Sequence, residues 1–207
     1  MLMDIHLHTV KYSWCSSIEP HDAVRRALEL KLNGIVLVEH DVVWNHEDII
    51  RLKEEAQAED LVILRGMEIS CNNKEGFRHG HLLVFGYFST PSYHRLSTCE
   101  IIEEVHHAGG VAIAAHPFRG GFGFGDDIYH LDLDGIEVYH PQHDPPRVRR
   151  AEQACRDLNL PSTGGSDAHE VEEIGTYLTY FSSPISSEED LVREIKEKRC
   201  RPITLSQ

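Results

Sequence analysis

The sequence predicts an α/β domain built on a largely parallel sheet. Short apolar runs alternate with segments of helical periodicity along all 207 residues, which is the pattern of strands joined by helices. This length supports one large core, so residues 1–207 are interpreted as a single domain. No GxGxxG or GxxxxGK(S/T) motif follows an apolar run, which excludes the dinucleotide-binding and P-loop versions of such a sheet. A closed barrel and an open doubly wound sheet both fit this pattern.

Seven strands and five helices are expected from the apolar periodicity. The expected strands are residues 3–6, 34–38, 62–69, 81–87, 111–115, 135–139 and 160–163. The expected helices are residues 20–32, 45–58, 98–108, 145–158 and 188–198. Ser97 with Glu100, and Ser186 with Glu189, have the capping-box spacing that marks a helix start. No helix-length segment separates the third and fourth strands, so these two are expected to form an antiparallel hairpin.

Composition limits the partners and the compartment. The formal net charge of −14 disfavours an extended nucleic-acid-binding face, although bound divalent cations would still admit a phosphorylated substrate at one place. No apolar run of about 18 residues occurs, so no membrane span is expected. The N-terminus lacks a secretory pattern, and the five cysteines form neither an even set nor a CxxC motif. We therefore expect a cytoplasmic protein without disulfides.

The sequence carries 15 histidines, and many stand at the ends of expected strands. Histidine is the commonest metal ligand and the usual acid–base residue near neutral pH. The candidate ligands at strand ends are His6, His8, His40, Asp41, Glu68, His81, His116, His140, Asp167 and His169. Most of them follow their strand, and in a β/α barrel the carboxyl ends of the strands carry the active site. We therefore expect these residues to converge on one metal-binding pocket.

Single members of this set also have simpler interpretations. The imidazoles of His6 and His8 would point to one side of a strand, but chance alternation gives the same spacing. Glu68 could bridge two cations or stand at an exposed loop edge, and His116 could be a hydrogen-bonded core histidine. Asp167 could begin an exposed turn. Six further histidines in helical or polar stretches are interpreted as surface residues: His21, His46, His94, His106, His107 and His130.

Six segments resemble, in chain order, the motif series of the PHP (polymerase and histidinol phosphatase) superfamily: DIHLHT, VEHD, GMEIS, GHLLVFG, AAHPFR and GGSDAH. The resemblance covers residues 4–169 and continues less closely to the end of the chain. A further segment, GIEVYHPQHDPPRV, resembles the PHP phosphoesterases that act on nucleotides and short oligonucleotides. The resemblance implies a distorted (β/α)7 barrel, TIM-like, with two or three divalent metal ions (Zn, Mn, Fe or Mg) at its C-terminal face.

The resemblance also implies roles for individual ligands. A first metal would be held by His6, His8, Glu68 and Asp167. A second would be held by Glu68, His81 and His116. A third would take His40 and His169, but the loop that usually supplies its remaining ligand reads VKYSWCSS and contains no Asp or His. Cys15 is the nearest soft ligand in that loop, and a thiolate would suit zinc. Without it, the site is dinuclear or completes its third position with water.

Two further residues are implied to act on the substrate. Arg119 in HPFR resembles the arginine that holds phosphate, for which the forked guanidinium is suited. His143 in YHPQHD corresponds to a position near the substrate. The expected reaction is hydrolysis of a phosphate ester by metal-activated water. The candidate substrates are nucleotides, short oligonucleotides and small phosphomonoesters.

Two rival functions are kept. An amidohydrolase-like enzyme would hydrolyse a C–N bond, but no strand end offers the lysine that such barrels use as a bridge. A catalytically silent PHP module would serve in binding, but eight of the nine implied ligand positions are filled. Only residues 86–97 stand where nucleotide-acting members carry an inserted subdomain, which implies a more open site.

Overall fold

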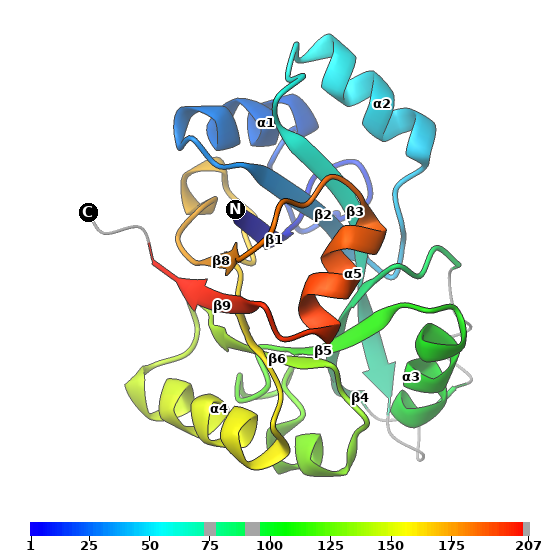
Figure 1. Ribbon diagram of the computed structural model, residues 1–207, viewed down its shortest axis with the longest axis vertical. Coiled ribbons are helices and arrows are strands. Elements are labelled where there is room, and N and C mark those ends of the chain that lie inside the picture. Colours follow the sequence, from blue (N-terminus) through cyan, green and yellow to red (C-terminus); the bar gives the residue numbers. More distant parts are fainter. Residues whose placement is uncertain (73–77, 90–95, 205–207) are drawn as a thin grey trace.

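The computed structural model describes residues 1–72, 78–89 and 96–204, and these form a nine-stranded sheet with five α-helices and two short 3-10 helices (Figure 1). The strands are β1 (Leu2–Leu7), β2 (Gly34–His40), β3 (Val62–Asn72), β4 (Arg78–Phe85), β5 (Val111–Ala115), β6 (Gly135–Tyr139), β7 (Ser162–Gly164), β8 (Leu178–Phe181) and β9 (Cys200–Ile203). The helices are α1 (Pro20–Glu29), α2 (His46–Glu55), α3 (Thr98–His107), α4 (Pro145–Leu158) and α5 (Glu188–Lys196), with the 3-10 helices η1 (Gly125–His130) and η2 (Val171–Glu173).

The sheet curls into a nearly closed barrel. Its strand order is β7-β6-β5-β4-β3-β2-β1-β8-β9. β4 is antiparallel to both β3 and β5, β8 is antiparallel to both β1 and β9, and the other neighbouring pairs are parallel. Thr179 of β8 joins the two flanks: its hydroxyl accepts a hydrogen bond from the N–H of Gly164 in β7 at 3.0 Å and donates one to the Gly164 carbonyl at 2.8 Å. A backbone bridge also pairs Leu7 with Ala168. The barrel is thus confirmed, and the open doubly wound alternative is eliminated.

Most of the expected elements are present. β5, β6 and α4 have the expected bounds. The other predicted elements are present but differ at their ends by up to three residues: α1 ends at Glu29 instead of residue 32, and β3 extends to Asn72 instead of residue 69. The predicted hairpin is confirmed, because β3 and β4 pair antiparallel along seven residue pairs. The capping box of α3 is confirmed: the Ser97 side chain accepts from the N–H of Glu100, and the Glu100 side chain accepts from the N–H of Ser97.

Two expectations about the C-terminal part were wrong. Strands β8 and β9 were not predicted, because each is only four residues long and mixes polar with apolar side chains. The expected capping pair Ser186–Glu189 is displaced by one residue. The N-cap of α5 is Ser187, whose side chain accepts from the N–H of Asp190, while the Ser186 hydroxyl bonds to the Asp190 carboxylate.

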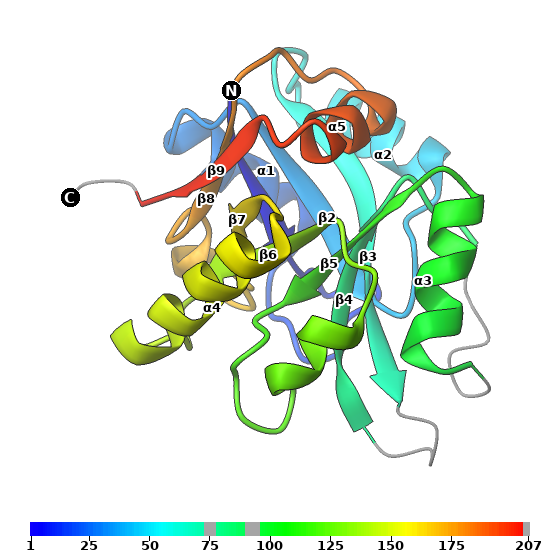
Figure 2. The same cartoon turned by 60° about the horizontal axis from the view of Figure 1, so that its bottom comes forward.

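The last helix closes one end of the barrel. Leu191, Val192 and Ile195 of α5 belong to the same buried cluster as inward-facing residues of the central strands, such as Ile5 and Leu83. Two separate clusters lie outside the sheet, under α1 and α2 on one side and under α3 and α4 on the other. Figure 2 shows α5 at the top, across the end of the sheet where β2 and β3 begin. The opposite end, where β1 and β2 finish, is left for polar side chains.

Candidate metal centre

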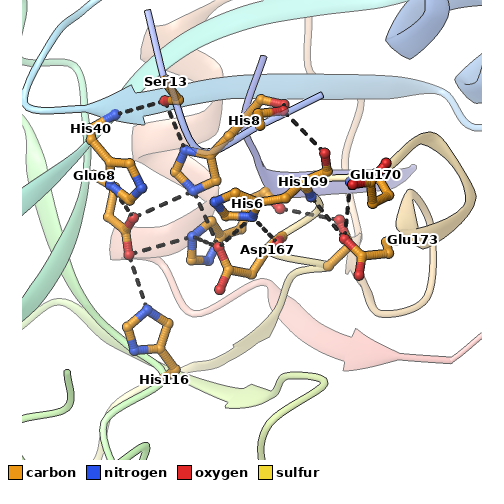
Figure 3. A network of polar contacts seen from close by, with 12 residues as sticks. His6, His8, Ser13, His40, Glu68, His116, Asp167, His169, Glu170 and Glu173 are labelled. Atoms are coloured by element: carbon orange, nitrogen blue, oxygen red, sulfur yellow. Dashed lines mark hydrogen bonds and ion pairs between the residues drawn. The ribbon is translucent and has the colours of Figure 1, made fainter. Parts of the chain in front are cut away.

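The two histidines of the HxH motif face two carboxylates at the open end of the barrel (Figure 3). His6 Nε2 lies 3.3 Å from Asp167 Oδ1 and 3.6 Å from Glu68 Oε1. His8 Nε2 lies 3.2 Å from the same Asp167 oxygen and 3.4 Å from Glu68 Oε2. One donor atom from each of these four residues falls within 4.8 Å of the others. The four residues implied for a first metal are therefore brought together.

Glu68 of β3 stands at the centre of the remaining histidines. Its Oε1 lies 2.8 Å from His81 Nδ1 and 3.0 Å from His116 Nε2, and its Oε2 lies 2.9 Å from His40 Nδ1. The side chain is only 1% exposed. The trio implied for a second metal, namely Glu68, His81 and His116, also has donor atoms within 4.8 Å. A single carboxylate thus touches both groups of candidate ligands.

Two further groupings differ from the sequence expectation. His40 and His169 gather with His8, rather than with Cys15, within 4.8 Å. Cys15 lines the cavity above but is absent from the ligand groups that the described residues form. A fourth group joins His116 and Asp167 with His140, a strand-end histidine that belongs to none of the three ligand sets implied by the resemblance.

The local backbone explains how these side chains reach one place. β4 runs opposite to β3 and β5, and its residue His81 pairs with Ser70 and Ala115. The first half of β4 therefore meets the carboxyl ends of its neighbours, which is why His81 lies in the first half of its strand, whereas His6, His40 and Glu68 lie in the second half of theirs. His116 and Asp167 have positive φ values, 30° and 49°. Such conformations are costly for residues other than glycine and are typical of functional sites.

Burial and charge set the protonation of these groups. Burial works against a charge on His6, but the carboxylates of Glu137 and Asp167 outweigh it and raise its pKa well above the usual value. Burial lowers the pKa of His8, and it lowers the pKa of His116 to about 4. Burial also opposes ionisation of Glu68 and Asp167, yet the surrounding histidines hold both pKa values well below the ordinary range. The site therefore holds two ionised carboxylates, beside one imidazole whose pKa they raise, His6, and two whose pKa burial lowers, His8 and His116.

The donor atoms of this site fit divalent cations. Among the described residues, three buried ring nitrogens of this site have no hydrogen-bond partner: His6 Nε2, His8 Nε2 and His116 Nδ1. Buried polar atoms are nearly always paired, and two of these nitrogens, His6 Nε2 and His8 Nε2, face the carboxylate oxygens of the cluster. Imidazole and carboxylate ligands suit zinc, iron or manganese, whereas magnesium prefers oxygen ligands and water. Cations placed among these atoms would satisfy them.

Arg119 lies at the junction of two cavities. Its Nη1 donates to Asp167 Oδ2 at 3.0 Å, and its guanidinium carbon lies 5.0 Å from the ring centre of Phe122. A cavity of about 490 Å³ on one side is lined by candidate ligands and by Trp14, which is 94% exposed. A cavity of about 260 Å³ on the other side is lined by polar residues, including His140. The arginine is thus within reach of whatever occupies either cavity.

His140 and His143 have different environments. His140 Nδ1 accepts a hydrogen bond from the N–H of Gln142 at 3.0 Å, and its Nε2 lies 3.1 Å from Asp167 Oδ2. This pairing places the ring proton on Nε2, so that His140 is a donor facing Asp167. His143 lies behind it, with ring centres 5.6 Å apart, and its Nδ1 donates to the Val138 carbonyl at 2.9 Å. Neither of the two cavities beside Arg119 is lined by His143.

Three buried carboxylates that support the ligands were not predicted. Asp4 accepts from the backbone N–H groups of His6, Ser166 and Gly175. Glu137 is fully buried and bonds to His6, and Glu39 is fully buried and accepts from Ser13, whose hydroxyl lies 3.4 Å from His8 Nδ1. A sequence signal existed for Asp4 and Glu137, since each stands between two apolar residues of a strand, where an unpartnered charge is costly.

The other histidines were interpreted as surface residues. His106 is an exception, because it is partly buried and its Nε2 lies 2.8 Å from Asp134 Oδ2. His21 is exposed and pairs with Glu55. His94 lies outside the described residues.

The comparisons with known families agree with this geometry. A family model for the PHP domain matches residues 4–116, and a model described as PHP-associated matches residues 145–200. The chain therefore belongs to the PHP family. An uncharacterized protein of Methanocaldococcus jannaschii is 28% identical over 155 residues, which cover 69% of this chain and 84% of that protein.

Solved structures with the same fold carry related names. A two-domain protein from Bacteroides vulgatus, which contains a predicted PHP-like metal-dependent phosphoesterase, matches with a TM-score of 0.71 and 20% identity over 99% of this chain. This chain spans 64% of that protein. A protein from Bifidobacterium adolescentis named as a metal-dependent phosphoesterase matches with a TM-score of 0.65 and 21% identity, covering 95% and 96% of the two chains. A protein from Chromobacterium violaceum named as an amidohydrolase, with bound sulfate and no metal, matches with a TM-score of 0.64 and 16% identity, covering 96% of each chain. At these identities the likeness establishes the fold.

None of the helices among the described residues has the length and apolar character needed to cross a membrane.

Proposed function

We propose that this PHP protein is a hydrolase that cleaves a phosphate ester at a centre of two or three divalent metal ions. The observation that carries the proposal is the meeting of His6 and His8 with Glu68 and Asp167, in which both Nε2 atoms are buried and lack hydrogen-bond partners. A site that only stabilised the fold would pair these atoms.

The ligand roles follow from the groupings. The first ion is assigned to His6, His8, Glu68 and Asp167, and the second to Glu68, His81 and His116. The third is assigned to His40 and His169, with His8 rather than Cys15 as the neighbour that the geometry offers. When bound, divalent ions of this kind acidify a water molecule and neutralise charge on phosphoryl oxygens.

The chain's own residues supply the remaining parts of the mechanism. Arg119 would donate two N–H groups to nonbridging phosphate oxygens. Its bond from Nη1 to Asp167 Oδ2 supports this role, because it places the guanidinium within reach of a charged oxygen at the cluster. His140 would donate its Nε2 proton to an oxygen at the same place, because Gln142 fixes its tautomer. A substrate role for His143 remains a prediction, and its position implies that it acts through His140.

The substrate proposed is a small phosphorylated molecule: a nucleotide, a short oligonucleotide or a phosphomonoester. The two cavities beside Arg119, of about 490 and 260 Å³, suit a ligand of that size. The net charge of −14 argues against a long nucleic acid, because repulsion outside the site would oppose it. C–N bond hydrolysis of the amidohydrolase type is less well supported, since no lysine lines the described cavities and Glu68 takes the bridging place.

Metal analysis followed by an activity screen tests this function. The purified protein should contain zinc, iron or manganese, and should release phosphate from at least one member of a panel. That panel comprises phosphomonoesters, 3′,5′-bisphosphonucleotides and short oligonucleotides, with amides and cyclic ureas as the comparison set. Bound metal with turnover of amides alone would favour the C–N hydrolase. Bound metal with no turnover of either set would favour the silent binding module.

A further inference from the structure

Glu137 is a buried carboxylate that stands beneath the candidate ligands without belonging to their groups. It is the third residue of β6, and its neighbours Ile136 and Val138 point the other way into the outer core. The side chain is 0% exposed. Its Oε1 accepts a hydrogen bond from His6 Nδ1–H at 2.8 Å, and its Oε2 accepts one from the backbone N–H of His116 at 2.8 Å.

The bond to His6 controls which ring nitrogen is free. A carboxylate only accepts, so His6 Nδ1 must carry the proton. Once the ring is neutral, as metal binding requires, its remaining lone pair is on Nε2, the atom that faces Asp167 and Glu68. A hydrogen bond from the far side of a metal-binding imidazole fixes the ring and raises its basicity.

The bond to His116 controls a strained piece of backbone. His116 has φ 30°, a conformation that is strained for a residue with a side chain. The Glu137 oxygen holds the N–H of this residue, while its Nε2 lies 3.0 Å from Glu68 Oε1. The same carboxylate therefore supports one residue of the first ligand group and one of the second.

The packing around Glu137 leaves space for nothing larger than hydrogen at residue 165. A Cβ on Gly165 would lie 2.4 Å from His6 Cβ and 2.7 Å from Glu137 Oε1. The turn that carries Asp167 therefore lies directly against the bonded pair. A misplaced Glu137 would disturb the ligands on both sides.

His8 has a different kind of support. Its Nδ1 lies 3.4 Å from Ser13 Oγ, which donates to Glu39 Oε2 at 2.5 Å. Glu39 also accepts from the indole N–H of Trp44 and from Thr9. Glu39 therefore reaches His8 only through the hydroxyl of Ser13, whereas Glu137 contacts His6 directly. The raised pKa of His6 and the lowered pKa of His8 agree with this contrast.

We propose that Glu137 is a positioning residue that sets the geometry of two adjacent metal positions at once. The inference rests on the proposed metal centre. For packing β6 against β1 alone, an uncharged side chain of equal size would serve without the cost of burying a carboxylate. The charge of Glu137 is therefore assigned to positioning His6 and His116.

Gln cannot take over this positioning role. Both N–H groups that contact Glu137 need an acceptor, and one of them would face the NH2 group of Gln instead.

The test compares zinc affinity in Glu137→Gln with that in a matched variant, Glu194→Gln. Glu194 is equally buried and accepts from Arg199 and from the N–H of Ser183, but it lies on α5 at the closed end. Competition with a chromogenic chelator should give about 10–100-fold weaker zinc binding for E137Q and unchanged binding for E194Q. Equal binding by E137Q and the wild type, or an equal loss in both variants, would overturn the proposal.

A second measurement needs no variant that might fail to fold. In the zinc-loaded wild type, nitrogen-resolved NMR should find a proton on His6 Nδ1, shifted downfield by its carboxylate partner, and none on Nε2. The opposite tautomer would overturn the positioning role while leaving the metal centre intact. A wild-type protein that binds no zinc, iron or manganese would instead remove the proposed function and this inference with it.

Discussion

His6 Nε2 on the first strand lies 3.3 Å from Asp167 Oδ1 on the turn after β7. The two residues come from opposite ends of the chain, and they meet only because the barrel closes through Thr179 and the Leu7–Ala168 bridge. We therefore expect occupation of the proposed metal site to be coupled to closure of the barrel. A cation bound here would hold β1 to the turn after β7.

Metal removal should lower thermal stability. A ligand at one hundred times its Kd stabilises the folded state by about 2.7 kcal/mol, which for a domain of this size corresponds to roughly 5–10 °C in Tm. Differential scanning fluorimetry of chelator-treated and zinc-reloaded protein measures the shift. An identical Tm with and without metal would argue against coupling between the site and the barrel.

Glu68→Gln should abolish metal-dependent turnover. The amide offers one weak oxygen ligand in place of a carboxylate that touches His40, His81 and His116. We expect a loss of at least about 10³-fold in kcat, comparable with the removal of a central electrostatic group, and weaker metal binding at both positions. The far-ultraviolet circular dichroism spectrum should stay native. Full activity in this variant would refute the bridging role.

Arg119→Ala should weaken turnover without loss of metal. The guanidinium is assigned to the phosphate and not to the cations, so kcat/KM should fall by about 10²-fold while the metal content stays at the wild-type level. Arg119→Lys should recover only part of the loss, because an ammonium lacks the forked geometry. Arg150→Ala is the control, since Arg150 pairs with Asp126 on the outside of the barrel. A parallel loss of metal would assign Arg119 to ligand support instead.

Gly165→Ala should lower the stability of the protein and weaken metal binding by displacing His6. The added Cβ would meet His6 Cβ at 2.4 Å, and overpacking of this kind costs about 1–3 kcal/mol. Urea unfolding should measure that loss, and chelator competition should find weaker zinc binding. Gly120→Ala is the matched control, because a Cβ there meets nothing within 4 Å. Equal behaviour of the two variants would contradict the close packing of His6.

Metal affinity should increase with pH around neutrality. Burial opposes the charge on His6, but Glu137 and Asp167 raise its pKa well above the ordinary 6.5, so the metal-free protein keeps a proton there. A cation on Nε2 must displace that proton, which gives up to about tenfold in affinity per pH unit. In the metal-free protein, protonated His6 contributes its full share to the free energy of unfolding below pH 6.5. That contribution is lost as the pH rises through the raised pKa that His6 has in the folded state.

Calorimetric titration checks this pH dependence. Repeating the zinc titration at pH 7 in buffers of different ionisation enthalpy should reveal about one proton released from His6 with the first ion. Metal uptake without proton release would mean that His6 is neutral in the metal-free protein.

Much of the site could be predicted from the sequence. Strand ends are visible as apolar runs that stop at a polar residue, and this placed His6, Glu68, His116 and Asp167 at one face before any coordinates. The PHP resemblance supplied the other members of each ligand set by position, and the family match agrees with that resemblance. The ligands were expected to meet because the carboxyl ends of parallel strands share one edge of the sheet.

The remainder depends on contacts that periodicity cannot express. Glu137 and Asp4 were missed because each is a single carboxylate inside a short apolar strand, and its hydrogen-bond partners, such as His6 and Ser166, come from distant parts of the chain. His140 was undervalued because its role depends on a bond from Gln142 that only the folded turn creates. Strands β8 and β9 are stabilised by pairing with β1 and with each other, and not by strong local propensity.

Helix α5 limits the directions from which small molecules can reach the site and leave it. Its apolar side fills the end of the barrel opposite the ligands, so the described part of the chain leaves no passage at that end. A molecule that enters beside Arg119 would then leave on the side where it entered. A released anion therefore competes directly with the next incoming molecule, and the rate at which the mouth empties sets an upper limit on how often it can be used.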